Sequence, residues 1–164
     1  MKKVLSIFLI LAVCFCFSGC GLFKDGIFIT QTSEANRLTD EIMECFKSFD
    51  KQRLKDLFSS NAKSTTTDFD TQIDEIFEYF DGDVISFKRT GGVAGSESVR
   101  KGKLTSSRIT NSGSVKIVTS EDEYKMSFSA VLVNEKESNI GIWRIWLGKS
   151  DSDYLIIGNS DMPN

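Results

Sequence analysis

The positions of apolar and polar residues divide the chain into a helical first part and a strand-rich second part. In residues 33–49, apolar residues recur every three or four positions, which is the spacing of one face of an α-helix. The same spacing recurs in residues 51–58 and, most clearly, in residues 69–80. Ser33 and Asp50 stand where N-caps are expected, because a short polar side chain can accept a hydrogen bond from the first turn. Three helices are therefore predicted before the strands begin.

From residue 84 onward the pattern changes to that of β-strands. The polar segment 98–110 fits an exposed strand, and Gly91, Gly92 and Gly95 mark a bend or loop before it. The clearer strands are three short ones and two long ones, at residues 84–90, 114–119, 154–157, 123–133 and 140–148.

The two long strands form a hairpin whose register can be predicted. Its turn is the polar segment 134–139. If this turn is symmetrical, apolar residues pair across the hairpin: Met126 with Leu147, Phe128 with Ile145, and Ala130 with Trp143. Paired residues share a face in an antiparallel ladder, so one face becomes uniformly apolar. A shift by one residue would destroy this agreement.

The same register turns a second apolar group toward the opposite face, together with the polar residues Lys125, Ser127, Ser129 and Arg144. The apolar members of this group are Val131, Val133, Ile140, Ile142 and Trp146. A solvated sheet face normally alternates into polar residues, so these five predict a homodimer interface. The alternative is that these five residues are covered within one chain, by segment 98–110, by residues 27–29 or by the C-terminal tail.

Helices followed by antiparallel strands predict one α+β domain, over residues 33–160, with its helices on one face of the sheet. In its element order, its long hairpin and its GIWRIWL strand, the chain resembles the NTF2-like superfamily. In that fold, also described as a cystatin-like cone, three N-terminal helices pack on a curved antiparallel sheet. The resemblance implies a pocket between helices and sheet, and often dimerisation through the sheet. It implies no single activity, because such a fold hosts many functions.

The first twenty residues have a pattern of their own. Two lysines precede an apolar run at residues 4–17, and the small pair Ser18–Gly19 leads to Cys20. This is the order of a secretory signal peptide. The run is shorter than the roughly 20 residues that a permanent transmembrane helix needs. We therefore expect the segment to be removed after export.

The sequence Phe17-Ser18-Gly19-Cys20 resembles the lipobox of bacterial lipoproteins, with Phe17 where that family usually has Leu. The resemblance implies that residues 1–19 are cleaved and that the Cys20 thiol is diacylated. Two acyl chains, unlike one, anchor a protein stably. Residues 20–32 would then tether the domain to the extracytoplasmic side of the cell membrane, as in uncharacterised bacterial lipoproteins with an NTF2-like domain. An ordinary signal peptide with a chance cysteine is the alternative.

Charge and cysteine content limit the classes of partner and the covalent links that the chain can have. The formal charge is −3, and it becomes −5 when the two signal-peptide lysines leave. A mildly acidic chain without a long basic run argues against nucleic acid as a partner. Of the four cysteines, Cys14 and Cys16 lie in the signal and Cys20 carries lipid. Cys45 is left without a partner, so no intrachain disulfide is expected.

The sequence offers little for catalysis or metal binding. Histidine is absent, which excludes His-based catalytic triads and His-containing zinc sites. Cys45 lies on the apolar stripe of the first helix, where a buried thiol is inert. The glycines at 91–95 lack the Gly-Lys-Ser/Thr of a phosphate loop, and the acids at 68–75 fit a helix start better than a calcium loop. We predict no catalytic residue, no metal site and no cofactor.

Two non-catalytic functions remain. The first is a protein-interaction or scaffold module at the membrane surface. The second is a protein that binds a small apolar ligand in a helix–sheet pocket, lined by Phe77, Phe80, Tyr124, Phe128 and Trp143. The alternative for these five rings is that they fill one another's space as core. An isomerase or hydrolase-type enzyme is a third possibility, because such enzymes can use a pocket Asp and a Tyr. The apolar hairpin face, however, offers Tyr124 alone as a polar group.

Overall fold

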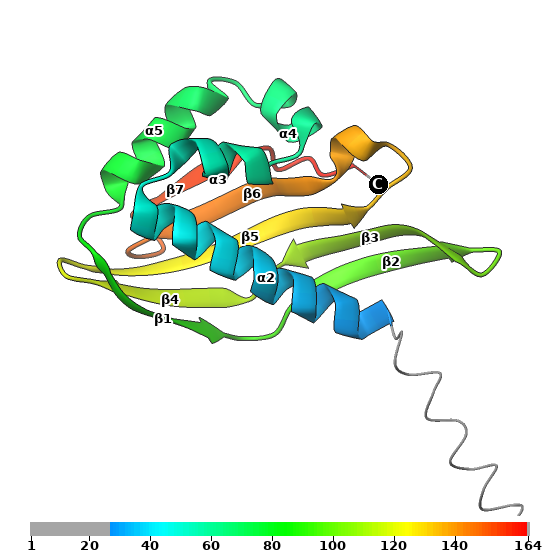
Figure 1. Ribbon diagram of the computed structural model, residues 1–164, viewed down its shortest axis with the longest axis horizontal. Coiled ribbons are helices and arrows are strands. Elements are labelled where there is room, and N and C mark those ends of the chain that lie inside the picture. Colours follow the sequence, from blue (N-terminus) through cyan, green and yellow to red (C-terminus); the bar gives the residue numbers. More distant parts are fainter. Residues whose placement is uncertain (1–26, 164) are drawn as a thin grey trace, which may run out of the picture. The chain divides into compact units, whose positions relative to one another are not determined.

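The computed structural model of the protein describes residues 27–163, with side chains from Gln31 onward. The predicted signal peptide, the predicted lipidation site Cys20 and most of the predicted tether lie outside the described residues. From Gln31 onward the chain forms one compact unit, in which helices come first and an antiparallel sheet follows (Figure 1). The α+β class predicted from the sequence is confirmed.

Four helices, not three, precede the sheet in the described part of the chain: α2 (Ile27–Ser48), α3 (Lys51–Leu57), α4 (Ser60–Thr65) and α5 (Phe69–Tyr79). Ser33 lies inside α2, so its prediction as an N-cap was wrong. Asp50 caps α3 as predicted, because its carboxylate accepts from the Arg53 amide at 2.9 Å. The short α4 was missed, because Ala62 is its single buried residue and one residue gives no period.

The helices bury apolar faces against the sheet and against one another. From α2 these residues are Ala35, Leu38, Ile42, Met43, Cys45 and Phe46, and from α5 they are Phe69, Ile73, Ile76 and Phe77. Two ion pairs join α3 to α5 at the surface: Lys51 with Asp74 at 2.7 Å and Lys55 with Asp70 at 2.6 Å. The acids at the start of α5 thus lie on a solvated surface.

Within residues 27–163, the sheet has seven antiparallel strands and is not closed. The strands are β1 (Val84–Thr90), β2 (Ala94–Arg100), β3 (Lys103–Asn111), β4 (Ser114–Thr119), β5 (Glu123–Val133), β6 (Gly141–Gly148) and β7 (Tyr154–Gly158). The segment 98–110, predicted as one exposed strand, contains parts of β2 and β3 and the turn between them. This correction follows from Gly102, which adopts a positive φ of 75° and allows the tight turn.

β1 and β2 follow one another along the sheet, and so do β3 and β4, with a short break inside each pair. β4 and β3 pair with successive parts of one edge of β5, while β1 pairs with β4 and β2 with β3. The breaks lie at Gly91–Val93 and at Ser112–Gly113. They lie side by side, because a Cβ on Gly113 would come within 3.3 Å of the carbonyl oxygens of Thr90, Gly91 and Gly92. β6 pairs with the other edge of β5, and β7 pairs with β6.

The predicted register of the β5–β6 hairpin holds over part of its length. Met126 pairs with Leu147 and Phe128 with Ile145, as predicted. Beyond Ser129 the register shifts by one residue, and Ala130 pairs with Ile142 instead of Trp143. One residue of β6 is therefore left unpaired in a β-bulge. A prediction that assumed a symmetrical turn could not include this bulge.

Candidate functional site

The helix-facing interior is filled by its own side chains. All five rings predicted to line a ligand pocket are buried: Phe77, Phe80, Tyr124, Phe128 and Trp143. Phe80 lies against Tyr124, with ring centroids 4.9 Å apart, and Phe46 stacks on Phe80 at 4.6 Å. These contacts are those of a packed core, which is the arrangement given above as the alternative to a ligand pocket.

The polar atoms of these rings are also occupied within the chain. The Tyr124 hydroxyl accepts from the Asp81 amide at 2.8 Å and donates to the Tyr79 carbonyl at 3.1 Å. The indole N–H of Trp143 donates to the Asn139 carbonyl at 2.7 Å. Tyr124 thus secures the C-terminal end of α5 to the sheet, which is a structural role.

The apolar group predicted to form a dimer interface is divided by the bulge. Ile142 is fully buried, because pairing with Ala130 turns it to the helix-facing side. Val131 is also buried, and it pairs with Arg108, whose guanidinium donates to the Pro163 carbonyl at 3.0 Å. Val131 is therefore buried within the chain beside Arg108, while Ile142 is buried on the helix-facing side and does not belong to the outer face.

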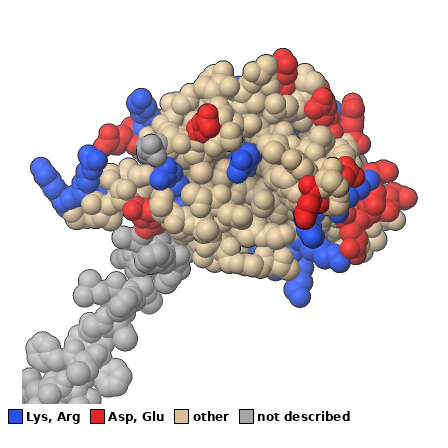
Figure 2. Space-filling view, turned by 180° about the vertical axis from the view of Figure 1, so that it is seen from behind, with Lys and Arg blue, Asp and Glu red and all other residues tan. Residues whose placement is uncertain are grey.

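The other three residues of that group keep some exposure. Ile140 is 41% exposed, and Val133 and Trp146 are half-buried. Of these, Trp146 lies at a hollow on the sheet face opposite the helices. This face, which we call the outer face, carries few charged side chains over its middle and more toward its ends (Figure 2).

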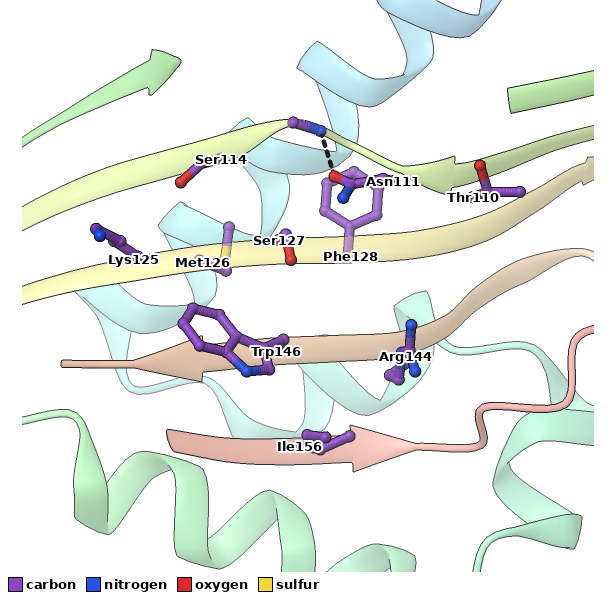
Figure 3. A pocket seen from close by; sticks show the side chains of 11 residues that line it. Thr110, Asn111, Ser114, Lys125, Met126, Ser127, Phe128, Arg144, Trp146 and Ile156 are labelled. Carbon is purple, nitrogen blue, oxygen red and sulfur yellow. Dashed lines mark hydrogen bonds between the residues drawn. The ribbon is translucent and has the colours of Figure 1, made fainter. Parts of the chain in front are cut away.

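The hollow is a groove of about 400 Å³ on the outer face, at the short break between β3 and β4 beside β5 (Figure 3). Its side chains come from β3, β4, β5, β6 and β7. They include Thr110, Asn111, Ser114, Lys125, Ser127, Phe128, Arg144, Trp146 and Ile156. Of the five predicted pocket rings, Phe128 belongs to this lining.

Local hydrogen bonds hold the break open. The Asn111 side-chain oxygen accepts from the Gly113 amide at 2.8 Å, and Gly113 has a φ of 78°, which favours glycine. The Ser112 hydroxyl accepts from the Phe128 amide at 3.0 Å, and its own amide donates to the Phe128 carbonyl. Ser112 thus satisfies the backbone of β5 at the point where the ladder is interrupted.

Aromatic and aliphatic side chains form a flat apolar floor beside the groove. The rings of Trp146 and Tyr154 stack with centroids 5.6 Å apart, and Ile156 lies directly across from Trp146 in the β6–β7 ladder. Gly148 leaves room for the indole, because a Cβ there would lie 2.6 Å from the Tyr154 Cβ and 3.0 Å from a Trp146 ring carbon. Tyr154 and Ile156 remain 44% and 42% exposed.

The charge beside this floor is positive. Arg144 and Lys125 both line the groove, and neither makes an ion pair or hydrogen bond with another side chain that the structure describes. Lys88, Lys116 and Lys125 face one another across β1, β4 and β5. Lys116 alone of this lysine row has an acidic partner among the described residues, Glu123 at 2.8 Å. The groove thus combines an apolar floor with cations whose charge is not balanced.

The described residues offer neither a reactive thiol nor a metal site. Cys45 is fully buried, and burial raises the pKa of its thiol to about 11, so it is not a nucleophile near neutral pH. Within residues 31–163, no group of Cys, Asp and Glu side chains is placed to hold a metal ion. Among the described helices, none is both long enough and apolar enough to cross a membrane.

The fold and the groove define an α+β domain with a packed interior and an open, positively charged hollow on its sheet face. The chain belongs to a family described as a domain of unknown function, DUF5104, whose model matches residues 41–150. The matched segment includes Lys125, Arg144 and Trp146. A comparison with curated proteins finds no match.

Proposed function

We propose that the chain is a lipid-anchored, non-catalytic protein-interaction module on the extracytoplasmic side of the cell membrane, with an NTF2-like domain. In this proposal the outer-face groove binds an acidic segment of another protein that also carries an apolar side chain. The anchor rests on the Phe17-Ser18-Gly19-Cys20 sequence, and the NTF2-like assignment rests on helices followed by an antiparallel sheet that is not closed.

One observation supports the interaction above all: Arg144 lies half-buried in the groove beside Trp146, without an acidic partner among the described side chains. A partly desolvated guanidinium gains most from a carboxylate, which it can bind through two parallel hydrogen bonds. Trp and Arg are also the residue types that contribute most to protein interfaces.

A second copy of the chain is the other candidate partner, because Tyr154 and Ile156 extend the apolar floor while still exposed. Charge argues against it. A two-fold interface places the same surface of both copies face to face, so two sets of unbalanced cations would meet. A small apolar ligand fits less well, because the groove is open and its rim is cationic.

Site-specific photocrosslinking in the cell tests the proposal. A photoreactive amino acid replaces Ser127 in the groove or, as the control, the exposed Thr71 on α5. We expect an adduct from Ser127 that Arg144→Glu removes, and none from Thr71. The adduct mass separates a different protein from a second copy. Equal adducts from both positions, or an adduct that Arg144→Glu leaves unchanged, would contradict the proposal.

A further inference from the structure

The turn of the β2–β3 hairpin carries three neighbouring cations, Arg100, Lys101 and Lys103. All three are exposed, and none makes an ion pair with another described side chain. The hairpin extends past the helices at one end of the sheet (Figure 1). These three positive charges stand close together in a chain whose formal net charge is −3.

The cations stand where they lower the stability of the hairpin. Arg100 lies directly across from Lys103, and like charges opposite one another are destabilising. Lys101 adopts a left-handed φ of 51°, next to Gly102 at 75°. In a two-residue turn of this kind, Asn or Gly is preferred at the first position. Residues that break such local preferences are expected at functional or strained sites.

This hairpin is bonded to Gln31, the first residue of the compact unit. The Gln31 side-chain amide donates to the Ser96 carbonyl at 3.3 Å and to the Ser107 hydroxyl at 3.4 Å. The first described side chain of the chain is therefore bonded to both strands of the hairpin. Cys20 is eleven residues before Gln31. Even when fully extended, eleven residues span no more than about 40 Å.

We propose that Arg100, Lys101 and Lys103 bind the anionic lipid headgroups of the membrane that holds the chain. This inference rests on the lipid anchor at Cys20 proposed above. Val99, which is 49% exposed beside the turn, would meet the interfacial region of the same bilayer. Each Lys or Arg near an anionic surface contributes about five-fold to association, or about 1 kcal/mol, so three contribute on the order of 100-fold.

Hydrogen exchange of the full acylated chain tests this contact. The chain is reconstituted in vesicles of phosphatidylcholine, with or without 30% phosphatidylglycerol, and exchange of the amides in residues 97–105 is followed. We expect at least ten-fold slower exchange on the anionic vesicles, and loss of this protection in 0.5 M NaCl, because salt screens exposed charges. Equal exchange on both vesicles would overturn the proposal and leave the hairpin free for a soluble acidic partner.

Two variants with the same change of charge sharpen the test. R100E/K101E/K103E should lose the protection, while R53E/K63E/K88E, which reverses three exposed or half-buried cations on other elements, should keep it. Loss of the protection in both variants would show that it depends on net charge alone, and this result would overturn the proposal. K101Q/K103Q, a milder change, should lose most of the protection if the first variant folds poorly. Acylation is measured separately by mass, so an absent anchor is distinguished from a hairpin that does not touch lipid.

Discussion

Trp146 stacks on Tyr154 across the last two strands, and this pair forms the apolar floor beside the groove on the outer face. Trp146→Ala should weaken binding of the groove's partner by about 10- to 100-fold, because aromatic anchors contribute about 2 kcal/mol or more to an interface. Since the indole is only half-buried, the variant should lose little folding stability. Titration of the captured partner against both forms, with urea unfolding alongside, measures the two effects. Unchanged affinity would remove Trp146 from the site.

Gly148 supplies the space that this stack requires. Gly148→Ala should lower the free energy of unfolding by about 1–3 kcal/mol, because the new methyl group overlaps Tyr154 and the indole. Gly92→Ala is the matched control, since no atom lies within 4 Å of a Cβ at that position. The control should change stability by less than about 0.5 kcal/mol. Equal unfolding midpoints for the two variants would show that the stack adjusts freely.

The anchor is tested outside the described residues. Wild type should incorporate labelled palmitate and partition into the detergent phase, and Cys20→Ser should do neither, because the thiol is the predicted acylation site. Cys45→Ser is the control and should remain acylated. Acylation of the Cys20→Ser variant, or secretion of wild type without lipid, would contradict the prediction.

Cys45 gives a pH dependence whose sign can be worked out. Burial raises the pKa of its thiol to about 11 from an ordinary value of 9.0, so the unfolded chain releases this proton first as the pH rises. The contribution to stability is complete below pH 9 and is lost between about pH 9 and 11, by about 2–3 kcal/mol. Wild type should therefore lose that much more stability over this range than Cys45→Ala. Parallel curves from urea unfolding would show that the thiol is not buried.

The sequence predicted the elements whose pattern is strong and missed those that depend on a single residue. The α5 stripe and the β5–β6 pairs at Met126 and Phe128 follow from periodic apolar positions, and the structure has them. The bulge at Trp143 lies outside any period, and it reverses the predicted face of Ile142. An apolar pattern states which residues avoid water but not which side of a strand they reach after a bulge.

The groove was predictable only in part for the same reason. Sequence reasoning placed Trp146, Arg144 and Lys125 on one face, and the structure brings them together there. Tyr154 and Ile156 were missed, because no register could be predicted for β7. The hollow itself depends on Gly113 and Gly148, because a Cβ at either position would crowd residues that are distant in the sequence or close only in the fold.

The lysine row of Lys88, Lys116 and Lys125 should lower the stability of the fold while it strengthens binding of an acidic partner. Lys116 lies between Lys88 and Lys125 in neighbouring strands, and like charges placed so lower stability by about 0.2–1 kcal/mol per pair. Lys125→Gln should therefore raise the free energy of unfolding at low salt. The gain should shrink in 0.5 M NaCl, where screening already weakens the repulsion. The same variant should bind the acidic partner several-fold more weakly. Lys136→Gln, which removes an exposed lysine that lies outside the row, should do neither. A loss of stability in Lys125→Gln at low salt would mean that the lysine packs favourably, and that the row carries no repulsion for a partner to relieve.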